Sequence, residues 1–288
     1  MLNFEKIKIY EPIIIIGHQC SDLDSLISCF FLSKLFSFKG IKNEIRFQDN
    51  YREWELKYSG IDYSDIKTGF SDSDNLFLVD HVFNYKNNIV GCIDHHPNAY
   101  SIPFGENFIE REQSSCAKII FDIMIEEGME ETKDLVYKTI MSIYGDTLSL
   151  KLKSKVIPSD LIWIKDKIKQ YGFNESEFLP SGLRLTNLNA PLSEIVKNKF
   201  KTINFADKLI NTSIVCVEYM IDSNFLHNIT EEIRNECIKF DSYFWILVIL
   251  CLKDEQSVVC QVFQDGRLKI EYFNRIVSRG RDILPRFK

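Results

Sequence analysis

The residues of this sequence that could do chemistry are histidines and aspartates gathered in a few short motifs. Residues 17–25 (GHQCSDLDS) follow four consecutive isoleucines. Asp80-His81 and Asp94-His95-His96 each end a later apolar run, and Asp146 follows an apolar helical pattern. Imidazole and carboxylate groups without paired thiolates suit Mn²⁺, Mg²⁺ or Co²⁺ better than a structural Zn²⁺. These motifs therefore predict a metal site.

The number of these groups favours two ions. Four of the five histidines lie in the motifs, together with five aspartates. Converging carboxylates without cations would repel one another, so metal ions are their natural partners. A carboxylate between two ions can bridge them. Two ions about 3.5–4 Å apart can activate water and stabilise the leaving oxygen in phosphoryl transfer.

Each motif also has a simpler structural interpretation when taken alone. Asp24 could be a helix N-cap. Asp80 and Asp146 could form turns, and the pair His95-His96 could be an ordinary surface feature. The same placement in four separate segments favours one shared metal site over four independent turns.

The elements that must position these residues alternate between strands and helices. The predicted strands are residues 13–17, 44–48, 75–80 and 89–94, and the predicted helices are 24–38, 114–127, 132–143 and 160–171. Such alternation implies a parallel α/β sheet, in which ligands collect outside the carboxyl ends of the strands. The acidic motifs lie directly after predicted strands or helices, which is the expected place for a site.

A stretch rich in proline, glycine and asparagine, about residues 181–191, predicts a linker. It separates a first domain, residues 1–180, from a second domain, residues 192–288. The second domain is expected to be a smaller α+β unit. Its predicted strands are 212–219, 243–252, 257–263 and 267–273, with a helix at 230–240 and His227 in a turn.

Composition limits the class of protein. The chain has 288 residues, of which 45% are hydrophobic and 26% charged, so it can bury a core. The formal net charge of −6 argues against general nucleic-acid binding, because no basic excess exists to displace phosphate counterions. No signal peptide is visible and no apolar run reaches the about 20 residues that cross a bilayer. We expect a cytoplasmic protein without a membrane segment, and a homodimer stays open.

The eight cysteines form no C-x-x-C pair and mostly lie among apolar residues. They are expected to be buried and reduced. Cys20 and Cys92 lie nearest to the predicted site, where a catalytic thiol is the less favoured alternative.

Taken together, the motifs resemble the DHH phosphoesterase superfamily, in the order His18-x-x-x-Asp22-x-Asp24, Asp80-His81, Asp94-His95-His96 and Asp146. Residues 278–285 (SRGRDILP) are similar to the S-R-K-K-Q-x-x-P signature of the family II, manganese-dependent inorganic pyrophosphatases. Residues 199–202 (KFKT) are similar to that family's D-x-K segment. The resemblance implies an α/β fold, with an N-terminal parallel-sheet DHH domain and a smaller C-terminal α+β domain of the DHHA2 type.

The resemblance also implies the role of each site residue. One divalent ion would be held by His18, Asp22 and Asp80, and the other by Asp24, Asp80, His95 and Asp146, with Asp80 as the bridge. Mn²⁺ is the expected metal, with Mg²⁺ or Co²⁺ as alternatives. Asp94 would not bind an ion but would fix the tautomer of the neighbouring histidine. The substrate-binding residues would be His96, Lys201, Arg279 and Arg281, and the catalytic residues would be Asp24, Asp80 and His96.

The predicted activity is hydrolysis of inorganic pyrophosphate to two orthophosphates by a metal-bridged hydroxide. Asp24→Asn and Asp80→Asn should each abolish it and leave folding nearly intact. However, the D-x-K aspartate is Lys199 and the lysine after the signature arginine is Gly280. Residues 22–25 (DLDS) and 114–116 (SSC) look more like the exopolyphosphatase and prune-type branch. The alternatives are therefore an exopolyphosphatase, a small-nucleotide phosphodiesterase, or a non-catalytic binding protein that kept the fold.

Overall fold

The computed structural model describes residues 2–19, 21–48, 59–62, 67–81, 85–96, 107–178, 185–197, 200–205, 208–240, 244–263 and 265–287. The chain divides into two compact units, Met1–Thr147 with Val156–Leu179, and Leu148–Lys155 with Pro180–Lys288. The segment Leu148–Lys155 falls in the first domain of the sequence-based division. It belongs to the second unit because Leu148 and Leu152 pack in the hydrophobic core of that unit.

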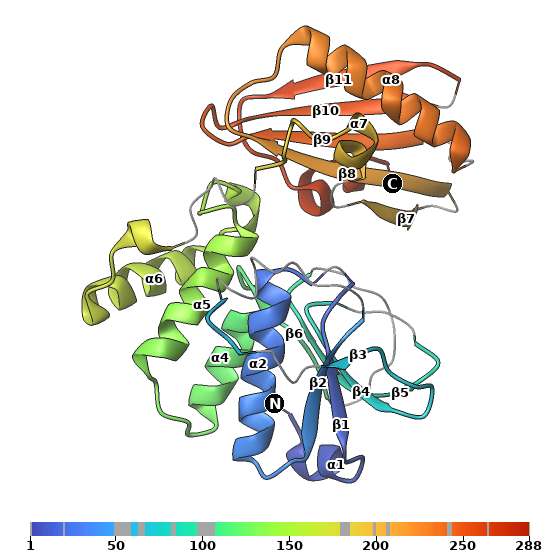
Figure 1. Ribbon diagram of the computed structural model, residues 1–288. Coiled ribbons are helices and arrows are strands. Elements are labelled where there is room, and N and C mark those ends of the chain that lie inside the picture. The colour runs from blue at the N-terminus through green and yellow to red at the C-terminus, as the bar shows by residue number, and fades with distance from the viewer. Residues whose placement is uncertain are drawn as a thin grey trace. The chain divides into compact units, whose positions relative to one another are not determined.

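In the first unit, the described strands form one parallel sheet (Figure 1). They are β1 (Ile13–Ile16), β2 (Asn43–Phe47), β3 (Lys67–Thr68), β4 (Asn75–Val79), β5 (Asn88–Asp94) and β6 (Phe108–Glu110). The predicted parallel sheet is confirmed. The short strands β3 and β6 were not predicted, because two or three residues carry too little periodicity to be recognised.

The strand order is β3-β2-β1-β4-β5-β6, and every neighbouring pair is parallel. After β1 the chain adds β2 and β3 on one side, and it then returns to place β4 on the other side of β1. The carboxyl ends of β1 and β4 therefore flank the point where the direction of winding reverses. Ligands of open α/β sheets bind at such a point.

The helices of the first unit are α1 (Phe4–Lys8), α2 (Leu23–Phe38), α4 (Cys116–Glu126), α5 (Lys133–Asp146) and α6 (Pro158–Tyr171). Helices α2, α4 and α5 pack against one another, and α2 and α4 also pack against the sheet (Figure 1). The isoleucines of β1 are at most 2% exposed, as expected for a central strand covered on both faces. Among the described residues, no helix is both long and apolar enough to cross a membrane.

The second unit contains a mixed sheet in the order β11-β10-β9-β8-β7. Its strands are β7 (Lys201–Phe205), β8 (Lys208–Val217), β9 (Phe244–Cys251), β10 (Gln256–Phe263) and β11 (Leu268–Phe273), with helices α7 (Leu192–Val196) and α8 (Ser223–Lys239). Strands β8 and β9 are parallel and the other pairs are antiparallel. The predicted fold class, a parallel-sheet α/β domain followed by a smaller α+β unit, is confirmed.

Helix α8 begins earlier than its pattern suggested. The prediction was 230–240 with His227 in a turn, but the helix starts at Ser223 and contains His227. The reason is Asp222, whose Oδ1 accepts a hydrogen bond from Phe225 N at 2.7 Å and caps the helix. The helix therefore gains two turns that the hydrophobic spacing did not reveal.

Candidate metal centre

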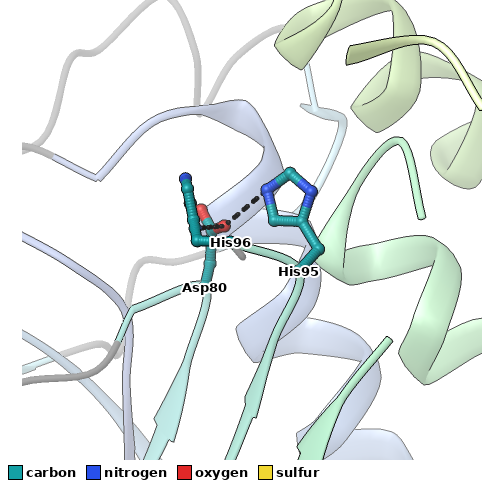
Figure 2. A group of neighbouring side chains, drawn as sticks. All are labelled: Asp80, His95 and His96. Atoms are coloured by element: carbon teal, nitrogen blue, oxygen red, sulfur yellow. Dashed lines mark ion pairs between the residues drawn. The ribbon is translucent and has the colours of Figure 1, made fainter. Parts of the chain in front are cut away.

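Asp80 lies at the middle of the group of acidic and imidazole side chains. It follows β4 directly and has a positive φ of 60°, a left-handed conformation that aspartate tolerates better than most residues. Its carboxylate is buried, at 3% exposure. Oδ2 lies 3.5 Å from Nε2 of His18. Oδ1 lies 3.4 Å from Nε2 of His95, and Figure 2 shows this second pair. The two oxygens of one carboxylate thus face two different imidazoles.

His18 reaches the centre from the turn after β1. A Cβ at Gly17 would collide with Ser25 Oγ, so only glycine fits where the strand meets α2. Ser25 Oγ also accepts a hydrogen bond from His18 N at 3.2 Å. On the ring, Nδ1 lies 2.6 Å from Gln19 O and donates to that carbonyl. Nε2 is therefore the nitrogen that faces Asp80, and it lies 3.7 Å from Asp22 Oδ1.

Asp22, and not Asp24, is the N-cap of α2. Its Oδ1 accepts from Asp24 N at 3.1 Å and from Ser25 N at 3.3 Å. The interpretation of Asp24 as a cap is therefore wrong, since Asp24 already lies in the first turn of the helix. Asp22 remains 29% exposed at its side chain, so one carboxylate both caps the helix and borders the centre.

The Asp24 carboxylate is 1% exposed and is held by donors from two other helices. Its Oδ2 accepts from Cys116 N at 2.8 Å, and its Oδ1 accepts from Ala117 N at 2.9 Å. Both amides belong to the first turn of α4, whose unsatisfied N–H groups favour an anion. Ser142 Oγ of α5 donates to Oδ1 at 2.6 Å. The carboxylate is thus fixed before any ion binds.

His95 is the histidine at the centre of the second group of carboxylates. Its Nδ1 donates to Gln113 O at 3.1 Å, which leaves Nε2 directed at the acids. Nε2 lies 3.4 Å from Asp80 Oδ1, 3.7 Å from Asp146 Oδ2 and 3.8 Å from Asp24 Oδ2. Among the described residues, neither His95 Nε2 nor Asp80 Oδ1 has a hydrogen-bond partner, although both are buried. A proton or a metal ion between these two atoms would remove the repulsion of two lone pairs that face each other.

Asp146 reaches the centre as the last residue of α5. A carboxylate at a helix C-terminus faces the negative end of the helix dipole, so helix stability alone gives no reason to place it there. Its side chain is 12% exposed and contributes Oδ2 to the group around His95. The placement favours a role toward a cation over the simpler interpretation of Asp146 as a turn former.

His96 is oriented by Asp94. The Oδ1 atom of Asp94 accepts from the ring Nδ1 of His96 at 2.8 Å and from the backbone amides of His95 and His96 at 2.8 and 3.2 Å. Burial acts to raise the pKa of Asp94, but the bond from His96 holds this pKa below its ordinary value. The His96 ring is 47% exposed and comes within 3.9 Å of Asp80 Oδ1 (Figure 2). Asp94 therefore supports His96, whereas the backbone of Gln113 supports His95.

Burial and crowding among the acids shift their protonation. Burial raises the pKa of Asp80 to about 8, and the Asp24 carboxylate adds to the rise. Burial also raises the pKa of Asp24, against the effect of His95. Burial alone would lower the pKa of His95, but the carboxylates of Asp80, Asp146 and Asp24 raise it to about 10. A metal-free centre thus retains protons in the places where cations fit.

The donor set fits divalent ions. In the described residues, three groups have ligand atoms within 4.8 Å of one another, namely His18 with Asp22 and Asp80, Asp24 with His95 and Asp146, and Asp80 with His95 and His96. Two ligands of one ion at about 2.0–2.2 Å lie roughly 3–4 Å apart, which matches the distances above. The six ligands that the sequence predicted therefore lie together, and their roles stay predictions.

A rise in pH is expected to destabilise the metal-free protein. The pKa values of Asp80 and His95 are higher in the folded protein than their ordinary values, so unfolding releases protons. The stability due to Asp80 is complete below its ordinary pKa and is lost as the pH rises through about 8, and that due to His95 is lost toward about 10. In chelator, calorimetry should show Tm falling by roughly 5 °C between about pH 6 and 8.5. Saturating Mn²⁺ should reverse this trend, and a flat profile in chelator would contradict the placement of these groups.

His81, the histidine of the Asp80-His81 motif, makes contacts within the fold. His81 Nδ1 lies 2.9 Å from Val79 O, and Nε2 lies 3.1 Å from the Tyr85 hydroxyl. Cys92 Sγ donates to His81 O at 3.3 Å, and burial raises the pKa of this thiol. Cys92 therefore stays protonated, which argues against a catalytic thiol. The described cysteines are all free and buried, and Cys20 lies outside the described residues.

Two of the predicted phosphate-binding residues, Lys201 and Arg279, are each linked to Thr212 in the second unit. Lys201 begins β7 and stands opposite Thr212 of β8 in the antiparallel ladder. Arg279 Nη1 donates to Thr212 Oγ1 at 3.1 Å. Burial lowers the pKa of Arg279 to about 10, which still leaves it protonated at neutral pH.

Arg281 has a structural contact of its own. Its Nη1 donates to the carbonyl of Ser154 at 2.8 Å. Asp282 Oδ2 accepts from Ser154 Oγ at 2.8 Å and from Ser278 N at 2.6 Å. Arg281 thus helps to fasten the segment Leu148–Lys155 to the C-terminal turn. This contact uses one of its five N–H groups and leaves its predicted role toward phosphate untested.

The chain matches one known sequence family, and its fold is similar to those of solved structures. Residues 12–144 match the DHH family, N-terminal domain. No curated protein sequence matches the chain. A Methanococcus jannaschii protein, provisionally named a family II inorganic pyrophosphatase, has a TM-score of 0.75 and 17% identity over 95% of this chain and 97% of its own. An exopolyphosphatase-related protein from Bacteroides fragilis has a TM-score of 0.47 and 14% identity over 90% of this chain and 81% of its own.

Proposed function

We propose that this protein is a metal-dependent hydrolase of phosphoanhydrides, with inorganic pyrophosphate as its substrate, because residues 12–144 match the DHH family, N-terminal domain. The fold shared with the Methanococcus jannaschii protein extends over both units and supports this proposal. At 17% identity this likeness concerns the fold, so the substrate rests on the residues of the centre.

The observation that carries the proposal is the position of Asp80 between two imidazoles. Oδ2 faces His18 at 3.5 Å and Oδ1 faces His95 at 3.4 Å. A single carboxylate in this position can bridge two ions, one held by His18 and Asp22 and the other by Asp24, His95 and Asp146. When bound, two such ions activate water and neutralise the charge that develops on a transferred phosphoryl group.

Backbone groups of the protein, together with the Asp94 side chain, orient the reacting groups. Gln113 O and Gln19 O hold the Nδ1 protons of His95 and His18, so each Nε2 faces the carboxylates. Asp94 holds Nδ1 of His96, and the half-exposed ring of His96 would contact a bound phosphate through its other nitrogen. Asp24 takes its position from the amides of α4. Such fixed positions provide much of the catalysis in phosphoryl transfer.

Lys201 and Arg279 belong to the second unit, where Thr212 accepts from Arg279 and stands opposite Lys201 in the ladder, and their role toward the substrate phosphate stays a prediction. Arg281 is the third candidate. A cytoplasmic location and a homodimer stay predictions, as does Mn²⁺ in preference to Mg²⁺ or Co²⁺.

The test is a phosphate-release assay on the full chain. Protein treated with chelator and reloaded with Mn²⁺, Mg²⁺ or Co²⁺ is given pyrophosphate, tripolyphosphate, long-chain polyphosphate or a linear dinucleotide. We expect the fastest release from pyrophosphate with Mn²⁺ and none in chelator. Faster release of phosphate from long-chain polyphosphate would show that the protein is an exopolyphosphatase. Cleavage of the dinucleotide alone would show that it is a phosphodiesterase. Two bound Mn²⁺ without turnover of any substrate would indicate a binding protein.

A further inference from the structure

The segment Gln113–Ala117 touches two of the proposed ligands with its backbone. Gln113 O accepts from Nδ1 of His95 at 3.1 Å. Cys116 N and Ala117 N donate to the two oxygens of Asp24 at 2.8 and 2.9 Å. The segment therefore decides where His95 and Asp24 point. None of these contacts involves a side chain of the segment, so the position of its backbone is what matters.

The backbone of this segment is fastened to the N-terminus of α6. Ser114 N donates to Asp160 Oδ2 at 2.7 Å, and Ile157 N donates to Ser114 Oγ at 2.8 Å. Asp160 is 2% exposed and Ser114 is fully buried. Among the described residues, the Asp160 carboxylate accepts its hydrogen bond from the backbone amide of Ser114. A buried carboxylate is rarely kept for stability alone, because its desolvation is costly.

From these contacts we infer that Asp160 is a positioning residue of the metal centre. It holds Ser114, and Ser114 lies between the carbonyl that orients His95 and the amides that orient Asp24. Loss of the Asp160 carboxylate frees the segment to shift, so that the Nε2 of His95 and the carboxylate of Asp24 no longer meet at one point. This inference rests on the proposed function.

The effect of Asp160 is specific to one of the two proposed ions. Asp24, His95 and Asp146 form one group of potential ligands, and the segment supports two of these three. His18 and Asp22 are held by their own turn, through Gln19 O and the first amides of α2. Removal of the Asp160 carboxylate should therefore weaken the binding of one ion and leave the binding of the other unchanged. A general loosening of the unit would weaken both.

The experiment measures Mn²⁺ binding to the metal-free full chain by calorimetric titration. For Asp160→Ala we expect one dissociation constant to rise by roughly 10- to 100-fold, the usual effect of losing a group that orients a ligand, and the other to change little. Electron paramagnetic resonance at fixed Mn²⁺ should show a coupled pair in the natural protein and a single ion in the variant. Asp160→Asn keeps an oxygen that accepts from Ser114 N and should restore two tight ions.

Two further variants distinguish the positioning role of Asp160 from a simple loss of stability. Ser114→Ala removes the hydrogen-bond acceptor of Ile157 N and should lower the affinity for the same ion as Asp160→Ala does. Ile164→Val lies on the same helix, is 1% exposed and should lower Tm without changing Mn²⁺ binding. Natural protein that binds no Mn²⁺ would refute the proposed function. Natural protein that binds two ions, while Asp160→Ala binds both unchanged or loses both equally, would refute the positioning role alone.

Discussion

Asp80→Asn is expected to abolish phosphate release, by on the order of 10³-fold or more, because both ions lose their common ligand. Its metal-free fold should be as stable as that of the natural protein or more stable. The buried carboxylate of Asp80 repels Asp24 and has an oxygen without a hydrogen-bond partner among the described residues. An amide does not ionise, so the variant avoids this repulsion as the pH rises through about 8. Phosphate release with Mn²⁺ and Tm in chelator measure the two effects.

The control for this prediction is the pH profile of the metal-free variant. If the raised pKa of Asp80 causes part of the loss of stability at high pH, Asp80→Asn should show a smaller fall in Tm than the natural protein. Full activity of Asp80→Asn with Mn²⁺ would refute the assignment of the centre. A collapse of the metal-free fold would contradict the view that this carboxylate is kept for the cations.

The sequence predicted a nearly intact fold for Asp24→Asn, but the contacts of Asp24 indicate that this variant should lose both activity and stability. Both oxygens of Asp24 accept backbone amides, from Cys116 and from Ala117. An asparagine side chain offers one oxygen, so its NH₂ group would face one of these N–H donors and leave it without a partner. An unsatisfied buried donor costs about 1–3 kcal/mol. For the metal-free protein this corresponds to a Tm lower by roughly 2–8 °C, measured by calorimetry.

The matched control is Asp22→Asn. Asp22 caps α2 through Oδ1 alone, and asparagine is an equally good cap, so this variant should keep its metal-free stability. It should still lose affinity for the ion that His18 helps to hold. Equal Tm values for Asp24→Asn and Asp22→Asn would show that the amides of α4 do not depend on the carboxylate.

Much of the first unit could be predicted from the sequence, because the signals are local. Four isoleucines in a row indicate a strand covered on both faces, and the strands that end at Asp80 and Asp94 have short apolar runs. Parallel strands place their carboxyl ends on one edge, so residues far apart in the sequence could be expected to meet there. The six predicted ligands do lie together in the structure.

Other features were visible in the sequence but were interpreted incorrectly or not recognised. Asp24 had the pattern of an N-cap, yet Asp22 caps α2. Asp222 caps α8 eight residues before the predicted start of that helix. The choice between neighbouring aspartates depends on which one has an extended backbone at the turn, and residue types do not reveal this.

By itself, the sequence determined the chemistry that gathers at the sheet edge, through residue types and their place after apolar runs. The tertiary structure alone decided how each group is held. Gln113 O orients His95, the amides of Cys116 and Ala117 fix Asp24, and Asp160 holds the segment between them. The physical reason is that backbone carbonyls and amides are the same in every residue. Which of them meets a given side chain depends on how α4 packs against the sheet and on how the N-terminus of α6 holds the segment before α4.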